Sequence, residues 1–143
     1  MNTGFLVVLA VLAYTVFATC NARSGGRIDA SLSSFIFNGL AAVVSLGVYF
    51  AQVYLSGARH TLTRPSGIGY SVVAGAAIGV FSIVLITIYG RGGQLSYVFP
   101  LVYGAAIALG AVVGFLALGE LVSTVRVVGV AAIVLGITLL AAA

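Results

Sequence analysis

Residues 68–89 read IGYSVVAGAAIGVFSIVLITIY, a stretch without a single charged side chain. The apolar core of a bilayer is roughly 30 Å thick, and a helix needs about 20 residues to cross it. This stretch therefore has the length and composition of a membrane-spanning helix. Four further stretches come near the same length, namely residues 4–21, 32–55, 97–118 and 124–142. The sequence thus predicts an all-α membrane protein with five transmembrane helices.

The composition argues against a water-soluble globular domain. The chain has 143 residues, of which 62% are hydrophobic and only 6% are charged. These charged groups are too few to cover a soluble surface. The connections between the five stretches leave no room for an extramembrane catalytic domain. We therefore expect one transmembrane domain over residues 1–143, with any function inside the helix bundle or at its rims.

The six arginines divide evenly between the two membrane faces. The N-terminus and the connections after the second and fourth spans share one face, side A, whose arginines are Arg59, Arg64 and Arg126. The arginines of the opposite face, side B, are Arg23, Arg27 and Arg91. An excess of Lys and Arg on the cytoplasmic side normally fixes the direction of insertion, so this tie predicts insertion in both directions. With an odd number of spans, the natural functional unit is then an antiparallel homodimer.

Groups that could support catalysis are scarce. The chain holds two carboxylates, Asp29 and Glu120, together with His60 and Cys20, all in different connections or at different span ends. Catalysis needs paired acid and base groups, an activated nucleophile or a metal cluster, and no phosphate-binding or dinucleotide fingerprint is present. We expect neither an enzyme nor a cofactor or metal site. Arginines placed singly or in pairs at span ends indicate interfacial anchors rather than nucleic-acid binding.

Uncharged polar side chains at membrane depth are the candidates for a substrate path. These residues are Tyr14, Thr15, Asn38, Ser82 and Tyr103. They can hydrogen-bond a neutral or zwitterionic solute, or stack on a cation through the tyrosine rings. For the two tyrosines the alternative is ordinary packing, and for Asn38 it is a hydrogen bond between helices. No ionisable residue lies near the middle of a span, which argues against carboxylate-driven proton coupling.

Two residues within the spans are candidates for shaping the helices. Gly79 forms with Gly75 a small-xxx-small spacing that lets another backbone come close, either in generic packing or beside a substrate path. Pro100 lacks an N–H group, so the fourth span either starts near it or is broken there. A broken helix would free backbone groups that can bind solutes, whereas the same residues near a rim only make a turn.

The connection before the fifth span carries a stop signal and an acidic residue. Gly119 is predicted to end the fourth helix, and Ser123 or Thr124 to cap the fifth. Glu120 lies just before the positive end of the fifth helix and six residues from Arg126. We therefore expect the helix dipole to stabilise Glu120, with an ion pair to Arg126 as a further possibility.

Several of these segments together resemble the EamA-like part of the drug/metabolite transporter superfamily. The resembling segments are residues 24–29 (SGGRID), 90–96 (GRGGQLS), 99–103 (FPLVY), 118–121 (LGEL), 128–129 (VG) and 135–137 (LGI). The five-span bacterial and archaeal members look closest, and the resemblance covers essentially the full chain. Ten-span members of the family look like two five-span units in opposite orientation with a solute path between them.

The resemblance implies a transporter in the cell inner membrane that moves a small organic solute, a metabolite or a drug-like compound. Alternating access would require a second, inverted copy of the chain, and the evenly divided arginines point the same way. Two departures bear on the substrate. Small multidrug resistance relatives embed a Glu in an early span, which is absent here, and many ten-span members have an Arg about where Asn38 stands. These departures argue against proton-coupled cation export and against anionic substrates.

A second hypothesis is a non-transporting accessory subunit. The glycines of the fifth span, Gly129 and Gly136, form a smooth ridge that suits association with another helix. Such a ridge would serve equally well to pack the chain against a larger membrane partner. In both hypotheses the surroundings of the chain are the lipid bilayer, and no nucleic acid is involved.

Overall fold

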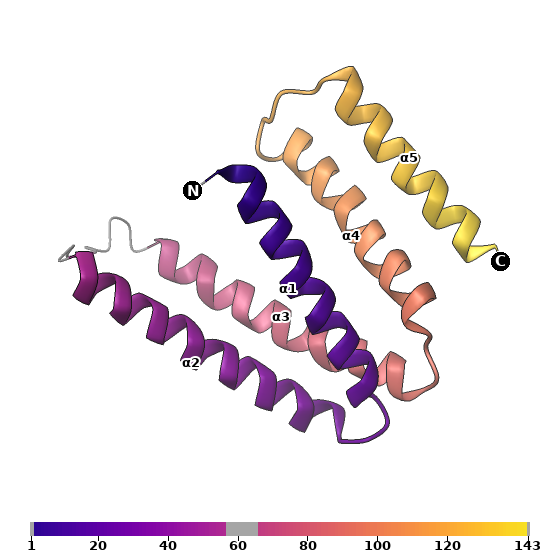
Figure 1. Ribbon diagram of the computed structural model, residues 1–143. Helices are drawn as coiled ribbons and strands as arrows, with labels where there is room; N and C mark the ends of the chain where they lie inside the picture. Colours follow the sequence, from indigo (N-terminus) through magenta and orange to yellow (C-terminus); the bar gives the residue numbers. More distant parts are fainter. Residues whose placement is uncertain (1, 57–65, 143) are drawn as a thin grey trace. The chain divides into compact units, whose positions relative to one another are not determined.

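A computed structural model describes residues 2–56 and 66–142, and these residues form an all-helical protein (Figure 1). The helices are α1 (Thr3–Ser24), α2 (Ala30–Ser56), α3 (Ser66–Gly90), α4 (Leu95–Leu116) and α5 (Thr124–Ala141). Among the described residues, these five helices are all long and apolar enough to cross a membrane. The five predicted stretches are therefore confirmed as helices of membrane-spanning length, with ends that shift by a few residues. The predicted rim loop with Arg59, His60 and Arg64 lies outside the described residues.

Hydroxyl side chains within the helices bond to the backbone of their own helix. Each donates to a carbonyl one turn earlier, as lipid offers no other acceptor. These bonds run from Thr15 to Val11 (2.8 Å), Ser45 to Ala41 (2.8 Å), Ser82 to Ile78 (2.6 Å) and Thr87 to Ile83 (2.7 Å). These four hydroxyl groups are therefore accommodated in apolar helices without a partner from another segment.

The helix ends follow local sequence signals. Asp29 caps α2, because its Oδ1 accepts hydrogen bonds from the backbone N–H groups of Ser31 (2.9 Å) and Leu32 (3.0 Å). Of the two candidates for α5, Ser123 is the cap, with an extended backbone and an Oγ that accepts from the Arg126 N–H at 3.3 Å. Gly119 follows the end of α4 with a φ of +65°, a conformation that favours glycine. The helix ends at Leu116 with Ala117 as its cap, and Gly119 belongs to the turn that follows.

Pro100 lies inside α4 rather than at a break. The helix begins at Leu95 and continues across Pro100 to Leu116. Of the two alternatives, a start of the fourth helix near Pro100 agrees with the structure, and a break at Pro100 does not. Because Pro100 has no N–H group, the helix lacks the hydrogen bond to the carbonyl of Ser96, and it nevertheless continues past the proline.

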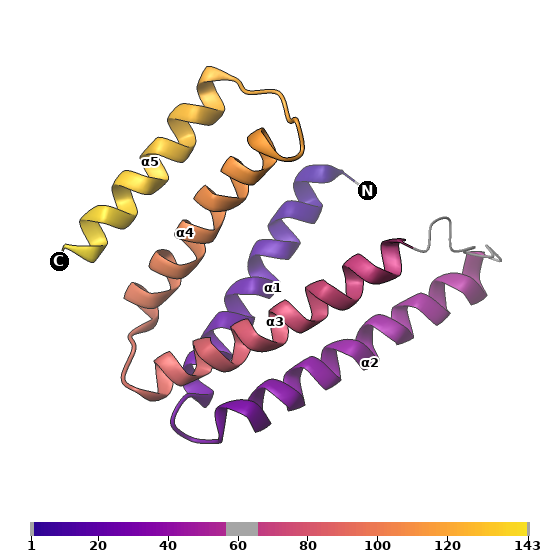
Figure 2. The ribbon, with the colours of Figure 1, turned by 180° about the vertical axis from the view of Figure 1, so that it is seen from behind.

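The described chain divides into two compact units, which we treat separately. Unit 1 comprises the residues up to Ala18 and those from Gly93 onwards, and unit 2 comprises Thr19–Gly92. In unit 1, α4 and α5 pack side by side and run antiparallel (Figures 1 and 2). In unit 2, α2 and α3 form a second antiparallel pair. The buried stripe of α3 consists of Ser82, Leu85, Ile86 and Tyr89, with the spacing of one helical face.

A glycine contact joins two turns of unit 2. A Cβ built on Gly25 would lie 2.7 Å from the Cβ of Tyr89 and 2.8 Å from the backbone nitrogen of Gly90. One built on Gly90 would lie 3.0 Å from the nitrogen of Gly26. No side chain fits into this contact without a shift of the backbone. The contact brings the α1–α2 turn against the end of α3, so the side B arginines, Arg23, Arg27 and Arg91, belong to one end of unit 2.

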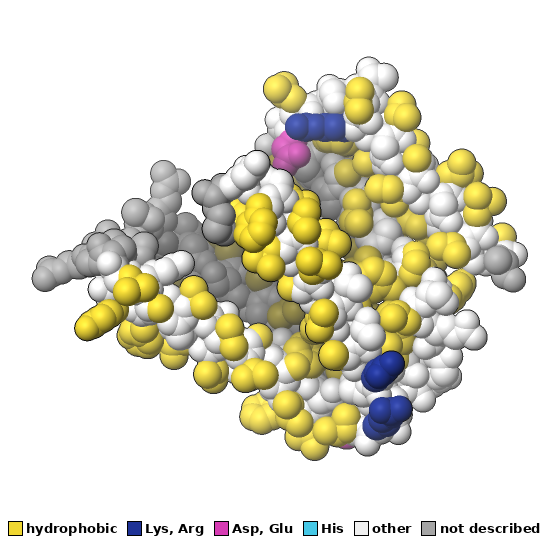
Figure 3. Space-filling model, viewed as in Figure 1, with side chains coloured by type: hydrophobic (Ala, Val, Ile, Leu, Met, Phe, Trp, Pro, Cys, Tyr) yellow, Lys and Arg dark blue, Asp and Glu magenta, His cyan; other side chains and the backbone are white. Residues whose placement is uncertain are grey.

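Other predicted helix contacts are not made within this structure. Within the described part of unit 2, nothing lies within 4 Å of a Cβ built on Gly75 or Gly79, so no backbone of that unit comes close there. Tyr89, at the end of α3, is only 5% exposed and lies against Gly25. The outer faces of the helices carry large hydrophobic side chains (Figure 3). Apolar helix surface of this extent suits contact with lipid rather than water.

Candidate functional site

Four aromatic rings gather in unit 1, and we call them the aromatic cluster: Tyr14, Phe17, Phe99 and Tyr103. The rings of Tyr14 and Tyr103 meet edge to face, with centroids 4.8 Å apart and planes at 79°. Phe99 lies 4.5 Å from Tyr103 and 6.0 Å from Tyr14, centroid to centroid. Phe17 stacks on Tyr14 at 5.8 Å. These distances and angles fall in the range that favours aromatic pairs beyond simple burial.

Helical spacing positions the aromatic cluster. Tyr14 and Phe17 are three residues apart on α1, and Phe99 and Tyr103 are four apart on α4, so each pair shares one helical face. Tyr14 and Tyr103 were predicted from the sequence as substrate-path candidates, whereas Phe17 and Phe99 were not. The helical spacing of each phenylalanine from a tyrosine could have indicated that the two rings share a face. What the sequence could not supply was the contact between α1 and α4.

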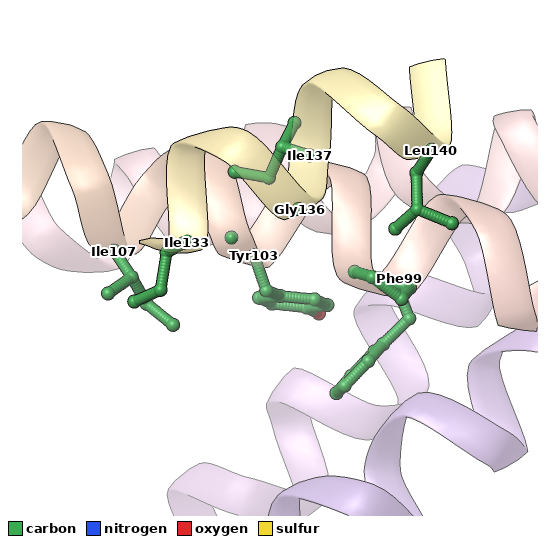
Figure 4. A pocket seen from close by; sticks show the side chains of 9 residues that line it. Phe99, Tyr103, Ile107, Ile133, Gly136, Ile137 and Leu140 are labelled. Carbon is green, nitrogen blue, oxygen red and sulfur yellow. The ribbon is translucent and has the colours of Figure 1, made fainter. Parts of the chain in front are cut away.

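Phe99 and Tyr103 also line a hollow between α4 and α5, which we call the apolar hollow (Figure 4). Its volume is about 410 Å³. The lining residues are Phe99, Pro100, Tyr103, Gly104, Ile107, Ile133, Gly136, Ile137 and Leu140. The hollow is within the size range of small-molecule sites, but its nearly complete lack of polar groups suits only the apolar part of a ligand.

A second hollow lies at the end of the α4–α5 pair, and we call it the charged hollow. Its volume is about 320 Å³. Its walls consist of Ala111, Phe115, Glu120, Arg126, Gly129, Val130 and Ile133. The Nη1 of Arg126 donates to the Leu121 carbonyl at 3.0 Å. Among the described residues no ion pair joins Glu120 to Arg126, so the possible pair considered from the sequence is not formed.

In unit 2, the hydrogen-bond donors of the candidate residues Asn38 and Ser82 are already used within their own helices. The Asn38 Nδ2 donates to the Ser34 carbonyl at 2.9 Å and to the Ser34 Oγ at 3.1 Å. Ser82 is fully buried, and its hydroxyl donates to Ile78. Neither side chain therefore has a donor left for a solute, although their oxygen atoms can still accept hydrogen bonds.

Two buried polar atoms of unit 2 were not singled out as site candidates from the sequence. The Nδ2 of Asn21 and the hydroxyl of Tyr89 have no hydrogen-bond partner among the described residues. Asn21 is 4% exposed and Tyr89 5%. A buried donor without a partner costs free energy, about 1–3 kcal/mol. Both residues lie at span ends, and only the packing of the α1–α2 turn on α3 reveals their burial.

The structure brings together only part of the predicted site. Tyr14 and Tyr103 are in contact in unit 1, and Thr15 follows Tyr14 on α1 with its hydroxyl bonded to Val11. Asn38 and Ser82 belong to unit 2. Within residues 2–56 and 66–142, no group of His, Cys, Asp and Glu side chains could hold a metal ion.

The fold defines an all-helical, multi-pass membrane protein by its five long apolar helices within the described part of the chain. No family model, no curated protein and no solved structure matches the sequence. The likeness to EamA-like transporters therefore stays a prediction from the residues that carry it.

Proposed function

We propose that this chain is one half of a membrane transporter for a small organic solute, completed by a second copy in inverted orientation. The observation that carries the proposal is the division of the arginines, three on each predicted face, in a chain with an odd number of spans. Such a chain has no preferred direction of insertion under the positive-inside rule. Both orientations then coexist in one membrane, and two inverted units can enclose a path that alternately opens to each side.

The aromatic cluster supports a role for unit 1 in contacting the solute. The rings of Tyr14, Phe99 and Tyr103 present both faces and edges within a small region. Aromatic faces attract organic cations and pack on planar apolar groups. The aromatic surfaces of the cluster therefore suit an apolar or cationic organic solute.

Uptake by purified protein in liposomes tests this proposal. Proteoliposomes are incubated with pools of organic cations and neutral metabolites, and the retained solutes are identified by mass spectrometry. Tyr14→Ala is expected to lower the uptake of the retained solute about tenfold, as it removes the central ring of the cluster. Tyr54→Ala is the matched control, because Tyr54 is 90% exposed at the end of α2. Equal uptake by both variants, or no uptake of any solute by the wild type, would contradict the proposal.

A further inference from the structure

The charged hollow holds an acid and a base that do not neutralise each other. The Glu120 carboxylate lies over the last turns of α4, where a Cβ built on Gly114 would come 3.1 Å from its Cδ and from its Oε2. Arg126 uses its Nη1 on the Leu121 carbonyl. A guanidinium carries five N–H donors. Apart from the bond to Leu121, no described residue accepts a hydrogen bond from the Arg126 guanidinium. Both charges are therefore available to a ligand in the same hollow.

The hollow lies at the end of two membrane-spanning helices. α4 ends at Leu116 and α5 begins at Thr124, so Glu120 belongs to the turn between them and Arg126 to the first turn of α5. Figure 3 shows a basic and an acidic side chain beside each other at this turn. In a chain that crosses the bilayer, span ends lie at the level of the lipid headgroups. The groups present there at high concentration are phosphates and ammonium groups.

Charge complementarity selects a ligand of both signs. A purely anionic ligand would satisfy Arg126 but face the Glu120 carboxylate, and a purely cationic one would face the guanidinium. A ligand with an ammonium and a phosphate satisfies both charges at once. The ammonium N–H groups donate to the carboxylate, and the phosphate oxygens accept from the guanidinium, whose planar fork matches phosphate geometry.

The remaining walls of the charged hollow are apolar. Phe115, Val130 and Ile133 line it, and Ile133 also lines the apolar hollow, so the two hollows are neighbours along the α4–α5 seam. Nothing lies within 4 Å of a Cβ built on Gly129, so the glycine keeps the space open. We propose that the charged hollow binds a phospholipid whose headgroup carries a primary ammonium and a phosphate, as in phosphatidylethanolamine, with its acyl chain against these side chains. This site is independent of the proposed transport.

Native mass spectrometry of the full chain in lipid-free detergent tests the proposal directly. Phosphatidylethanolamine, phosphatidylcholine and phosphatidylglycerol of identical acyl chains compete at equal concentration. We expect phosphatidylethanolamine to bind about tenfold more tightly than phosphatidylglycerol, which lacks the ammonium group. Phosphatidylcholine, whose ammonium has no N–H to donate, should fall between them. Equal binding of phosphatidylethanolamine and phosphatidylglycerol would overturn the proposal.

Variants of the two charged residues and of Gly114 assign the preference to the hollow. Glu120→Gln should abolish the preference for phosphatidylethanolamine over phosphatidylglycerol, and Arg126→Gln should weaken both. Gly114→Ala should reduce the preference by displacing the carboxylate. Gly110→Ala is its control one turn earlier, where nothing lies within 4 Å of the added Cβ. Unchanged lipid preference in Glu120→Gln, with helix content intact by circular dichroism, would contradict the assignment.

The acyl-chain contact has its own test. Gly129→Leu fills the charged hollow and should lower lipid binding about tenfold, whereas Ala131→Leu, which lines neither hollow, should leave it unchanged. Free phosphoethanolamine should bind far more weakly than the lipid. If the free headgroup binds as tightly as the lipid, the proposed lipid site is wrong. A second outcome would also overturn the proposal. If the wild type binds no lipid and Gly129→Leu dissociates a dimer, the charged hollow is a contact between two protein chains.

Discussion

Gly25 and Tyr89 lie so close that a methyl group on the glycine would come 2.7 Å from the tyrosine Cβ. The contact joins the α1–α2 turn to the last turn of α3, and the neighbouring Gly26 and Gly90 continue it. It holds one end of unit 2 together by backbone proximity rather than by side-chain packing. Such close approach is the usual way in which membrane helices gain dispersion contacts.

Replacing Gly25 by alanine should destabilise the protein by about 1–3 kcal/mol, because the turn or α3 must shift to admit the methyl group. Gly39→Ala is the matched control, since nothing lies within 4 Å of a Cβ built there in the interior of α2. That control should stabilise the helix by about 0.5–1 kcal/mol. Denaturation followed by circular dichroism in detergent micelles measures both. Equal stability of the two variants would show that the Gly25–Tyr89 contact is absent in the membrane protein.

The edge-to-face contact between Tyr14 and Tyr103 predicts an energetic coupling between the two residues. A double-mutant cycle with Tyr14→Leu and Tyr103→Leu should give about 0.5–1.5 kcal/mol, the range for such aromatic pairs. The same cycle between Tyr14 and Tyr54 should give no coupling, because Tyr54 belongs to the other unit and is 90% exposed. Denaturant titration in micelles provides the four free energies of each cycle. Additive effects of the two leucine substitutions would rule out the ring contact.

The N-terminal cap of α2 rests on the Asp29 carboxylate. Its Oδ1 accepts two backbone N–H groups, so Asp29→Ala should lower the free energy of unfolding by about 0.5–2 kcal/mol. Asp29→Asn keeps an oxygen acceptor at the same place and should recover most of this loss. A comparison of the thermal transitions of both variants separates the cap from the charge. Equal losses in the two variants would assign the effect to the charge.

The positions of the helices could be predicted from the sequence because residues within or next to each helix determine them. The length and polarity of each span are set by the bilayer, and Asp29, Ser123 and Gly119 mark helix ends through groups within a few residues of them. Pro100 left two alternatives open in the sequence, a helix start or a break, and only the structure shows that the helix begins at Leu95 and continues past the proline. Local signals therefore predict where helices begin and end, but not whether a helix continues past a proline.

The candidate site was predicted less completely because its cause is not local. Tyr14 and Tyr103 meet only through the packing of α1 on α4, and their neighbours Phe17 and Phe99 gain a role only from that packing. The small-xxx-small spacing of Gly75 and Gly79 did not identify a close contact between helix backbones. Within the described part of unit 2, Gly79 has no close neighbour, whereas Gly25, which carries no such motif, touches Tyr89. Small residues permit an approach, and tertiary packing decides where it is made.

The central claim is that the chain inserts in both directions, and C-terminal fusions test it most directly. A reporter active only in the cytoplasm and one active only outside are fused in parallel to the wild type, Arg91→Gln and Arg126→Gln. The wild type should give activity with both reporters. Arg91→Gln leaves side B with the fewer arginines and should shift the C-terminus outwards, and Arg126→Gln should shift it inwards. Activity of a single reporter in the wild type, unmoved by either substitution, would contradict the claim.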